Sequence, residues 1–151
     1  MQIGISEKGR ELVAESLEMF LADTYALYLK TQSAHWNYTG KEFYSLHLLF
    51  EKQYQEMAEA IDEIAERVRS LGFFVEASFS SFQKKSSLPS QKELIPSEML
   101  EDLVTSNEIL ICQARGLCQL AEKEDDGATL DLLGRRLATH EKNLWMLKNC
   151  L

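Results

Sequence analysis

The chain has 151 residues, 45% of them hydrophobic, which is enough for a single domain over residues 1–151 with a sizeable core. Its 24 acidic and 16 basic residues give a net charge of -8, which disfavours nucleic acid and anionic membranes as default partners. No apolar run approaches the ~18 residues of a membrane span, and the first ten residues lack a signal-peptide stretch, so a cytoplasmic protein is expected. The three cysteines include no CxxC pair and are interpreted as reduced thiols.

Helical periodicity of the apolar residues predicts two long helices in the first half of the chain. The first is expected over residues 6–34 and the second over 42–71, with Gly72 ending the second. Residues 37–40, Asn-Tyr-Thr-Gly, have the composition of a tight reversal. The two helices are therefore expected to pack as an antiparallel hairpin.

Residues 73–96 differ in composition, because they are rich in serine and carry both prolines, Pro89 and Pro96. This segment is long enough for a crossover between two helices, and a short helix is expected at residues 78–83. A third helix is predicted over 97–123 with Ser97 as N-cap, then an acidic turn at 124–127 and a fourth helix to residue 149. The predicted fold class is all-α, a four-helix bundle with a long crossover carrying a short helix between helices two and three.

Five potential metal ligands have an informative spacing: His35, His47, Glu51, Asp62 and Glu66. At ~100° per residue, the last four share one stripe of the second helix, yet Glu51 and Asp62 lie ~16 Å apart along its axis. One ion cannot be held by both ends of a straight helix, whereas two copies lying antiparallel across a two-fold axis would close the gap. Imidazole with carboxylate suits Fe(II), and open coordination positions would admit an oxidant.

The acidic half of this stripe also has a simpler explanation. Asp62, Glu63 and Glu66, followed by Arg67 and Arg69, fit a solvated helix face with ion pairs four residues apart.

Three other residues are interpreted as structural. Trp36 and Trp145 are expected to be core or interface aromatics, and His140 has no second ligand at a useful spacing.

The stretch HWNYTGKEFYSLHLLFEKQYQEMAEAIDEIAERVRSLG resembles the signature of the Dps family, the DNA-binding proteins from starved cells, also called mini-ferritins. The stretch DLLGRRLATHEKNLWMLK is similar to that family's last helix. The resemblance implies a ferritin-like bundle, a homo-dodecameric shell, and a ferroxidase that oxidises Fe(II) with hydrogen peroxide or O2 and stores ferric mineral. Iron is the implied metal, with zinc as a substitute. The implied ferroxidase ligands are His35, His47, Glu51, Asp62 and Glu66, with Glu51 standing where some members have aspartate.

The same resemblance implies that Asp125, Asp126 and Asp131 line a three-fold pore that admits iron, and helix capping is the alternative role for these acids. The expected function is iron storage and detoxification of iron and peroxide under oxidative stress. The alternatives are a nucleoid-associated protein that binds and protects DNA, with secondary iron chemistry, and a purely structural shell. The intact ligand set argues against the last. An acidic chain without a lysine-rich tail is not expected to bind DNA stably at physiological salt.

Overall fold

The computed structural model describes residues 1–90 and 95–151, and all regular structure in these ranges is helical. The helices are α1 (Glu7–Asn37), α2 (Phe43–Ser70), α3 (Phe79–Lys85), α4 (Pro96–Lys123) and α5 (Gly127–Lys148). The predicted all-α bundle with a short helix in its crossover is therefore confirmed, although part of the expected crossover, residues 91–94, lies outside the described ranges. None of the described helices is long and apolar enough to cross a membrane.

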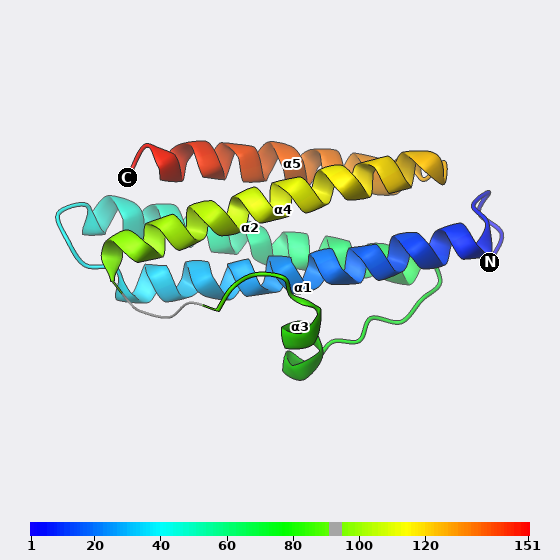
Figure 1. Cartoon of the computed structure of the whole chain (residues 1–151), viewed down its shortest axis with the longest axis horizontal. Helices are drawn as coiled ribbons and strands as arrows, with labels where there is room; N and C mark the ends of the chain where they lie inside the picture. The colour runs from blue at the N-terminus through cyan, green and yellow to red at the C-terminus, as the bar shows by residue number, and fades with distance from the viewer. Residues whose placement is uncertain (91–94) are drawn as a thin grey trace.

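Two antiparallel hairpins, α1 with α2 and α4 with α5, lie side by side along the bundle (Figure 1). The chain leaves α2 at one end and returns to the other end before α4, so α2 and α4 run in the same direction (Figure 1). The short helix α3 lies on this return path and packs against α1. This topology brings the reversal between α1 and α2 to the end of the bundle that also holds the C-terminus (Figure 1).

Local capping chemistry sets most helix ends where the sequence predicts them. The Ser6 hydroxyl accepts from the Gly9 N–H at 3.0 Å and starts α1, while Gly72, with φ of 100°, follows the end of α2. The start of α4 differs from the prediction, because Ile95 rather than Ser97 is the N-cap. Pro96 occupies the first turn, where its fixed φ favours the helix and its missing N–H costs no hydrogen bond.

The core runs the length of the bundle between the two hairpins. The largest side chains with less than 2% exposure come from α1, α2 and α4 and include Phe20, Phe50, Leu17, Leu21, Leu27, Leu46, Met57, Ile64, Met99, Leu103 and Leu110. Trp36 and Trp145 are each 63% exposed, so neither is a core residue, and the alternative expectation of interface aromatics stays a prediction. Both indole rings are left available for contacts outside the chain.

The three cysteines are free thiols, as expected. Burial is the main cause that raises the pKa of the Cys118 thiol, which favours its inert protonated form.

A buried carboxylate holds the residues that follow α3 against α1. Asp23 has no exposed surface, and its oxygens accept from the Ser86 hydroxyl at 2.6 Å, the Ser87 N–H and hydroxyl at 2.7 Å each, and the Leu88 N–H at 3.2 Å. The Gln113 amide on α4 donates to the same carboxylate. A buried charge requires this many donors, so the contact fixes α3 and the residues after it on α1.

Candidate metal centre

The two histidines beside the reversal form a stacked pair. His35 lies in the last turn of α1 and His47 in the second turn of α2, and their ring centroids are 3.8 Å apart with an interplanar angle of 17°. Each ring bonds the backbone of the other residue: Nδ1 of His35 lies 2.9 Å from the His47 carbonyl oxygen, and Nδ1 of His47 lies 3.0 Å from the His35 carbonyl oxygen. The hairpin register therefore locks both rings by one reciprocal contact.

These hydrogen bonds decide which nitrogen can bind a metal. A carbonyl oxygen only accepts, so Nδ1 of each ring must carry the proton and donate. In the neutral form of each ring, Nε2 is then the nitrogen that keeps its lone pair. A fixed Nδ1–H to carbonyl contact is the usual way in which proteins orient a metal-binding histidine. The residues present therefore fit a metal ion that takes two imidazole nitrogens.

The predicted carboxylate ligands lie along the exposed stripe of α2. Glu51 is half-buried one turn after His47 and accepts from the Gln55 amide at 3.5 Å, while Asp62 and Glu66 are exposed near the other end of the helix. Within residues 1–90 and 95–151, no three His, Cys, Asp or Glu side chains come together closely enough to hold a metal ion. The chain brings the two histidines together and leaves the carboxylates apart, so the five-ligand set remains a prediction that requires a second copy.

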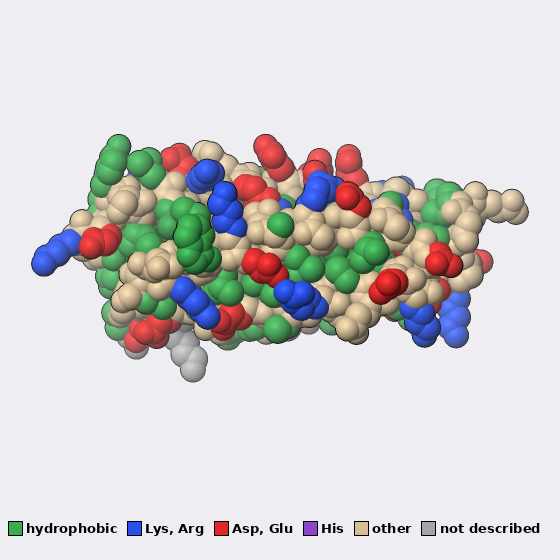
Figure 2. Space-filling view, turned by 90° about the horizontal axis from the view of Figure 1, so that it is seen from above, with side chains coloured by type: hydrophobic (Ala, Val, Ile, Leu, Met, Phe, Trp, Pro, Cys, Tyr) green, Lys and Arg blue, Asp and Glu red, His purple; other side chains and the backbone are tan. Residues whose placement is uncertain are grey.

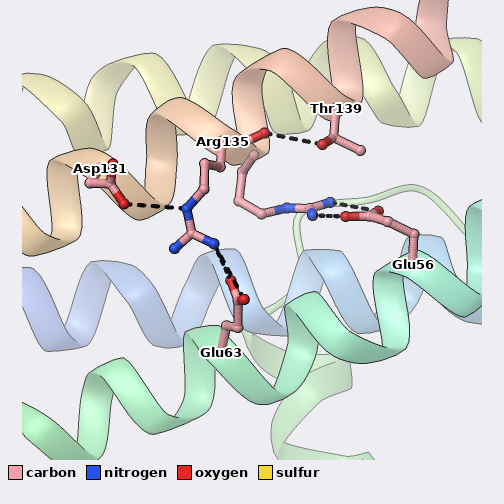
Figure 3. Close-up of polar contacts among 6 residues, drawn as sticks. Glu56, Glu63, Asp131, Arg135 and Thr139 are labelled. Carbon is pink, nitrogen blue, oxygen red and sulfur yellow. Dashed lines mark hydrogen bonds and ion pairs between the residues drawn. The ribbon is translucent and has the colours of Figure 1, made fainter.

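The neighbouring acids on α2 are neutralised from α5, not along α2. A groove of about 410 Å³ lies between α2 and α5. Two ion pairs join α5 to α2 here, Arg135 with Glu63 at 2.9 Å and Arg136 with Glu56 (Figure 3). Arg135 also contacts Asp131 of its own helix at 3.3 Å. The ion pairs four residues apart that the sequence allowed on α2 are absent from the described residues.

Helix geometry explains this division of the acids. Relative to His47, Asp62 and Glu66 project near 60° and 100°, whereas Glu63 and Glu56 project near 160° and 180°, toward α5. Asp62 and Glu66 take part in no ion pair of the described chain. Asp62 and Glu66 on the ligand stripe therefore make no ion pair, while Glu56 and Glu63 on the adjoining face have arginine partners.

The acidic turn before α5 is built around a buried carboxylate. Asp126 is 1% exposed and accepts from the Thr129 N–H at 3.0 Å, the Thr129 hydroxyl at 2.6 Å and the Arg67 guanidinium at 2.6 Å. Burial opposes ionisation of Asp126, but the Arg67 and Thr129 hydrogen bonds outweigh it and lower its pKa. Asp126 is thus the N-cap of α5, and the prediction of pore-lining acids narrows to the exposed Asp125 and Asp131.

Two aromatic contacts at the histidine pair were not anticipated from the sequence. The Tyr54 ring meets His35 edge-on at 5.2 Å, and the Phe43 ring lies 5.2 Å from His47. Tyr54 follows His47 by seven residues, so it lies on the same face of α2 two turns later. This seven-residue spacing could have predicted that Tyr54 lies near the histidine pair.

Three comparisons relate the chain to known proteins. The sequence profile of the ferritin-like domain matches residues 14–151. A low temperature-induced protein of Nostoc sp. is 36% identical over 152 residues, spanning 99% of this chain and 85% of that protein. The DNA protection during starvation protein of Porphyromonas gingivalis is 33% identical over 145 residues, spanning 95% of this chain and 91% of that protein.

Among solved structures, the similarity extends along the whole bundle. The crystal structure of a Dps protein from Vibrio cholerae, described as a member of a broad superfamily of ferritin-like diiron-carboxylate proteins, matches with a TM-score of 0.93. At 32% identity, this match covers 99% of the present chain and 94% of the other.

Proposed function

The chain belongs to the Dps family of ferritin-like proteins, and on that premise we propose that it is a ferroxidase working at sites shared between two subunits. Iron storage and protection are the functions that this diiron family supports. We propose further that Fe(II) is oxidised by hydrogen peroxide or O2, and that the ferric product is stored inside a homo-dodecameric shell. The five residues predicted to bind iron are His35, His47, Glu51, Asp62 and Glu66.

The observation that carries this proposal is the reciprocal lock of His35 and His47. Two stacked imidazoles, each with Nδ1 committed to a carbonyl, cost the chain conformational freedom and leave Nε2 of each neutral ring as the metal-binding atom. A packing role for these rings does not require both Nδ1 atoms to be engaged. Preorganised imidazole donors favour a divalent transition metal, and Fe(II) accepts imidazole with carboxylate.

A second copy would supply the carboxylates that one chain cannot. With α2 of two subunits antiparallel across a two-fold axis, His47 and Glu51 of one copy face Asp62 and Glu66 of the other. Asp62 and Glu66 are exposed and make no ion pair within the described residues, so they are free to bind iron at a neighbouring subunit's site.

The chemistry of such a site is a two-electron reduction of the oxidant. Two Fe(II) ions, one hydrogen peroxide and two protons give two Fe(III) ions and two waters, with the O–O bond broken and no hydroxyl radical released. The protein residues contribute by holding Fe(II) on anionic and imidazole donors, which favours the more highly charged Fe(III) product. Zinc accepts the same donors but has no redox chemistry, so it would bind as an inhibitor.

Subunit complementation tests the shared site. His47→Ala and Asp62→Ala shells should each oxidise Fe(II) slowly, because every site in either shell lacks one ligand. When the two variants are dissociated, mixed equally and reassembled, each mixed two-fold pair has one site lacking both ligands and one intact site. Random pairing therefore restores about a quarter of the sites.

The matched control mixes His47→Ala with Glu101→Ala, a change at an exposed acid on α4. Each mixed pair in this control keeps one damaged site and one intact site, whether or not sites are shared between subunits. The decisive comparison is therefore His47→Ala with Asp62→Ala. Activity no higher than that of the two parents, with mixing confirmed by mass spectrometry, would disprove the shared site. A monomeric mass for the native protein would disprove it directly.

DNA binding, the alternative function, has less support. Acidic and basic side chains are interspersed along the face shown in Figure 2, and surface lysines and arginines such as Arg115 and Lys148 pair with Glu141 at 2.6 Å and Glu108 at 2.5 Å. With a net charge of -8, the field of the whole chain repels phosphates.

A further inference from the structure

Three of the five tyrosines in the chain form a continuous line of ring contacts that starts at the histidine pair. The Tyr54 ring meets His35 at 5.2 Å between centroids, Tyr28 meets Tyr54 at 6.0 Å, and Tyr25 meets Tyr28 at 5.9 Å. The first two contacts are edge-on, with interplanar angles of 73° and 87°. The line ends on α3, where Phe82 lies 5.1 Å from Tyr25.

Helical spacing builds this line from two elements. Tyr25, Tyr28 and His35 lie three and seven residues apart on α1, so they share one face, and Tyr54 reaches them from the partner helix α2. The Tyr28 hydroxyl accepts from the Gln32 amide at 3.0 Å, one turn nearer to His35. All three tyrosines are half-buried, and Tyr28 and Tyr54 pack against the core.

Packing alone does not account for the residue type. Phenylalanine would fill the same edge-on positions, as Phe79 does next to Tyr25. What tyrosine adds is a phenol, which can lose one electron together with its proton and form a neutral radical. A line of phenols in ring contact can pass that oxidising equivalent from one ring to the next.

We propose that Tyr54, with Tyr28 and Tyr25 behind it, donates the second electron when a site holds a single Fe(II) and meets hydrogen peroxide. The inference rests on the proposed ferroxidase function. Hydrogen peroxide takes one electron from Fe(II) and one from Tyr54, its O–O bond breaks, and both oxygens leave as water. The phenol gives up one proton and solvent supplies the other, so Fe(II), peroxide, tyrosine and one proton yield Fe(III), a tyrosyl radical and two waters.

This electron relay, formed by Tyr54, Tyr28 and Tyr25, prevents a harmful side reaction that the two-iron reaction does not prevent. A lone Fe(II) supplies only one electron to peroxide, and the remaining product is hydroxide with a hydroxyl radical. Tyr54 is the phenol in direct ring contact with a predicted iron ligand, and Tyr28 and Tyr25 move the radical away toward α3. The tyrosine line thus makes an under-loaded site harmless.

Rapid-freeze electron paramagnetic resonance tests this role on the assembled protein. Native shells are mixed anaerobically with less Fe(II) than there are sites, then with hydrogen peroxide, and Fe(II) oxidation is followed in the same samples. We expect a tyrosyl radical, identified by loss of hyperfine structure with ring-deuterated tyrosine. Tyr54→Phe should reduce this signal severalfold and increase spin-trapped hydroxyl radical. Tyr44→Phe, a matched change on the same helix at a side chain 74% exposed, should change neither.

The outcomes distinguish electron donation by Tyr54 from the ferroxidase function on which it rests. Fe(II) oxidation without a tyrosyl radical, or a radical yield that Tyr54→Phe leaves unchanged, would overturn the relay and leave the ferroxidase function standing. Failure of the native shell to oxidise Fe(II) at all would overturn the proposed function and the relay with it.

Discussion

Acidification should destabilise this protein through His140, a side chain that folding seals inside the bundle. Its ring has no exposed surface, and its pKa falls from 6.5 to about 3, first because burial penalises the charged form and second because Arg136 lies beside it. The Asn107 amide donates to the Leu103 carbonyl, which leaves Oδ1 of Asn107 to accept from Nδ1 of His140 at 3.0 Å. Nε2 of the ring then accepts from the Arg136 guanidinium, 3.3 Å away.

The size and sign of the effect follow from this geometry. A proton on Nε2 would replace the hydrogen bond from Arg136 by two cations in contact. Between the folded-state pKa of about 3 and the unfolded-state pKa near 6.5, the unfolded chain binds more protons than the folded one. The stability due to neutral His140 is therefore complete above pH ~6.5 and falls by about 1.4 kcal/mol for each pH unit below it. From about pH 8 to pH 5, the loss reaches about 2 kcal/mol.

Urea unfolding followed by circular dichroism, at one protein concentration, measures this loss. His140→Gln keeps a neutral polar side chain that does not titrate here, so its free energy of unfolding should fall by about 2 kcal/mol less than that of the wild type from about pH 8 to pH 5. Groups that titrate in both proteins cancel in the difference. Equal pH dependence for the two proteins would refute the reasoning, as would an NMR titration that places His140 of the folded protein near 6.5.

Three further outcomes are expected. Asp126→Asn should lower the free energy of unfolding by about 3 kcal/mol, because Arg67, 15% exposed, loses its charged partner; a loss under about 1 kcal/mol in urea unfolding would contradict this. Asp131→Asn should slow iron uptake at low Fe(II), and the defect should shrink with salt because the Debye length is only ~8 Å at ~0.15 M. Unchanged uptake at low ionic strength would place iron entry elsewhere. Finally, the native protein should retain little plasmid DNA at ~150 mM salt in a mobility-shift assay, and tight retention without divalent metal would show that the net charge misleads.

The fold was predictable because its signals are local. Ser6 and Gly72 mark helix ends by their own chemistry, and the long apolar stripes left no alternative to a bundle. The misplaced start of α4 shows the limit of the same approach. Ser97 and Pro96 both suit a helix start, and composition alone does not choose between a serine cap and a proline in the first turn.

The site was predictable only where helix periodicity decides it. Spacing places His47 and the carboxylates on one stripe of α2, but it does not reveal that each histidine Nδ1 bonds the other residue's carbonyl, because that contact depends on the hairpin register. The ion pairs were missed for a related reason. Glu63 and Arg67 are four residues apart, yet each has a better-placed partner on or before α5, in Arg135 and Asp126.

The arginines near α2 make their contacts away from the predicted ligand stripe. Arg135 and Arg136 neutralise the acids of α2 that face α5, and Arg67 turns away to Asp126. By tying the arginines to other elements, the fold leaves negative charge on the stripe that a second subunit and Fe(II) would meet. The tertiary ion pairs therefore leave the predicted ligands Asp62 and Glu66 without an ion-pair partner, although none of the three arginines is itself a predicted ligand.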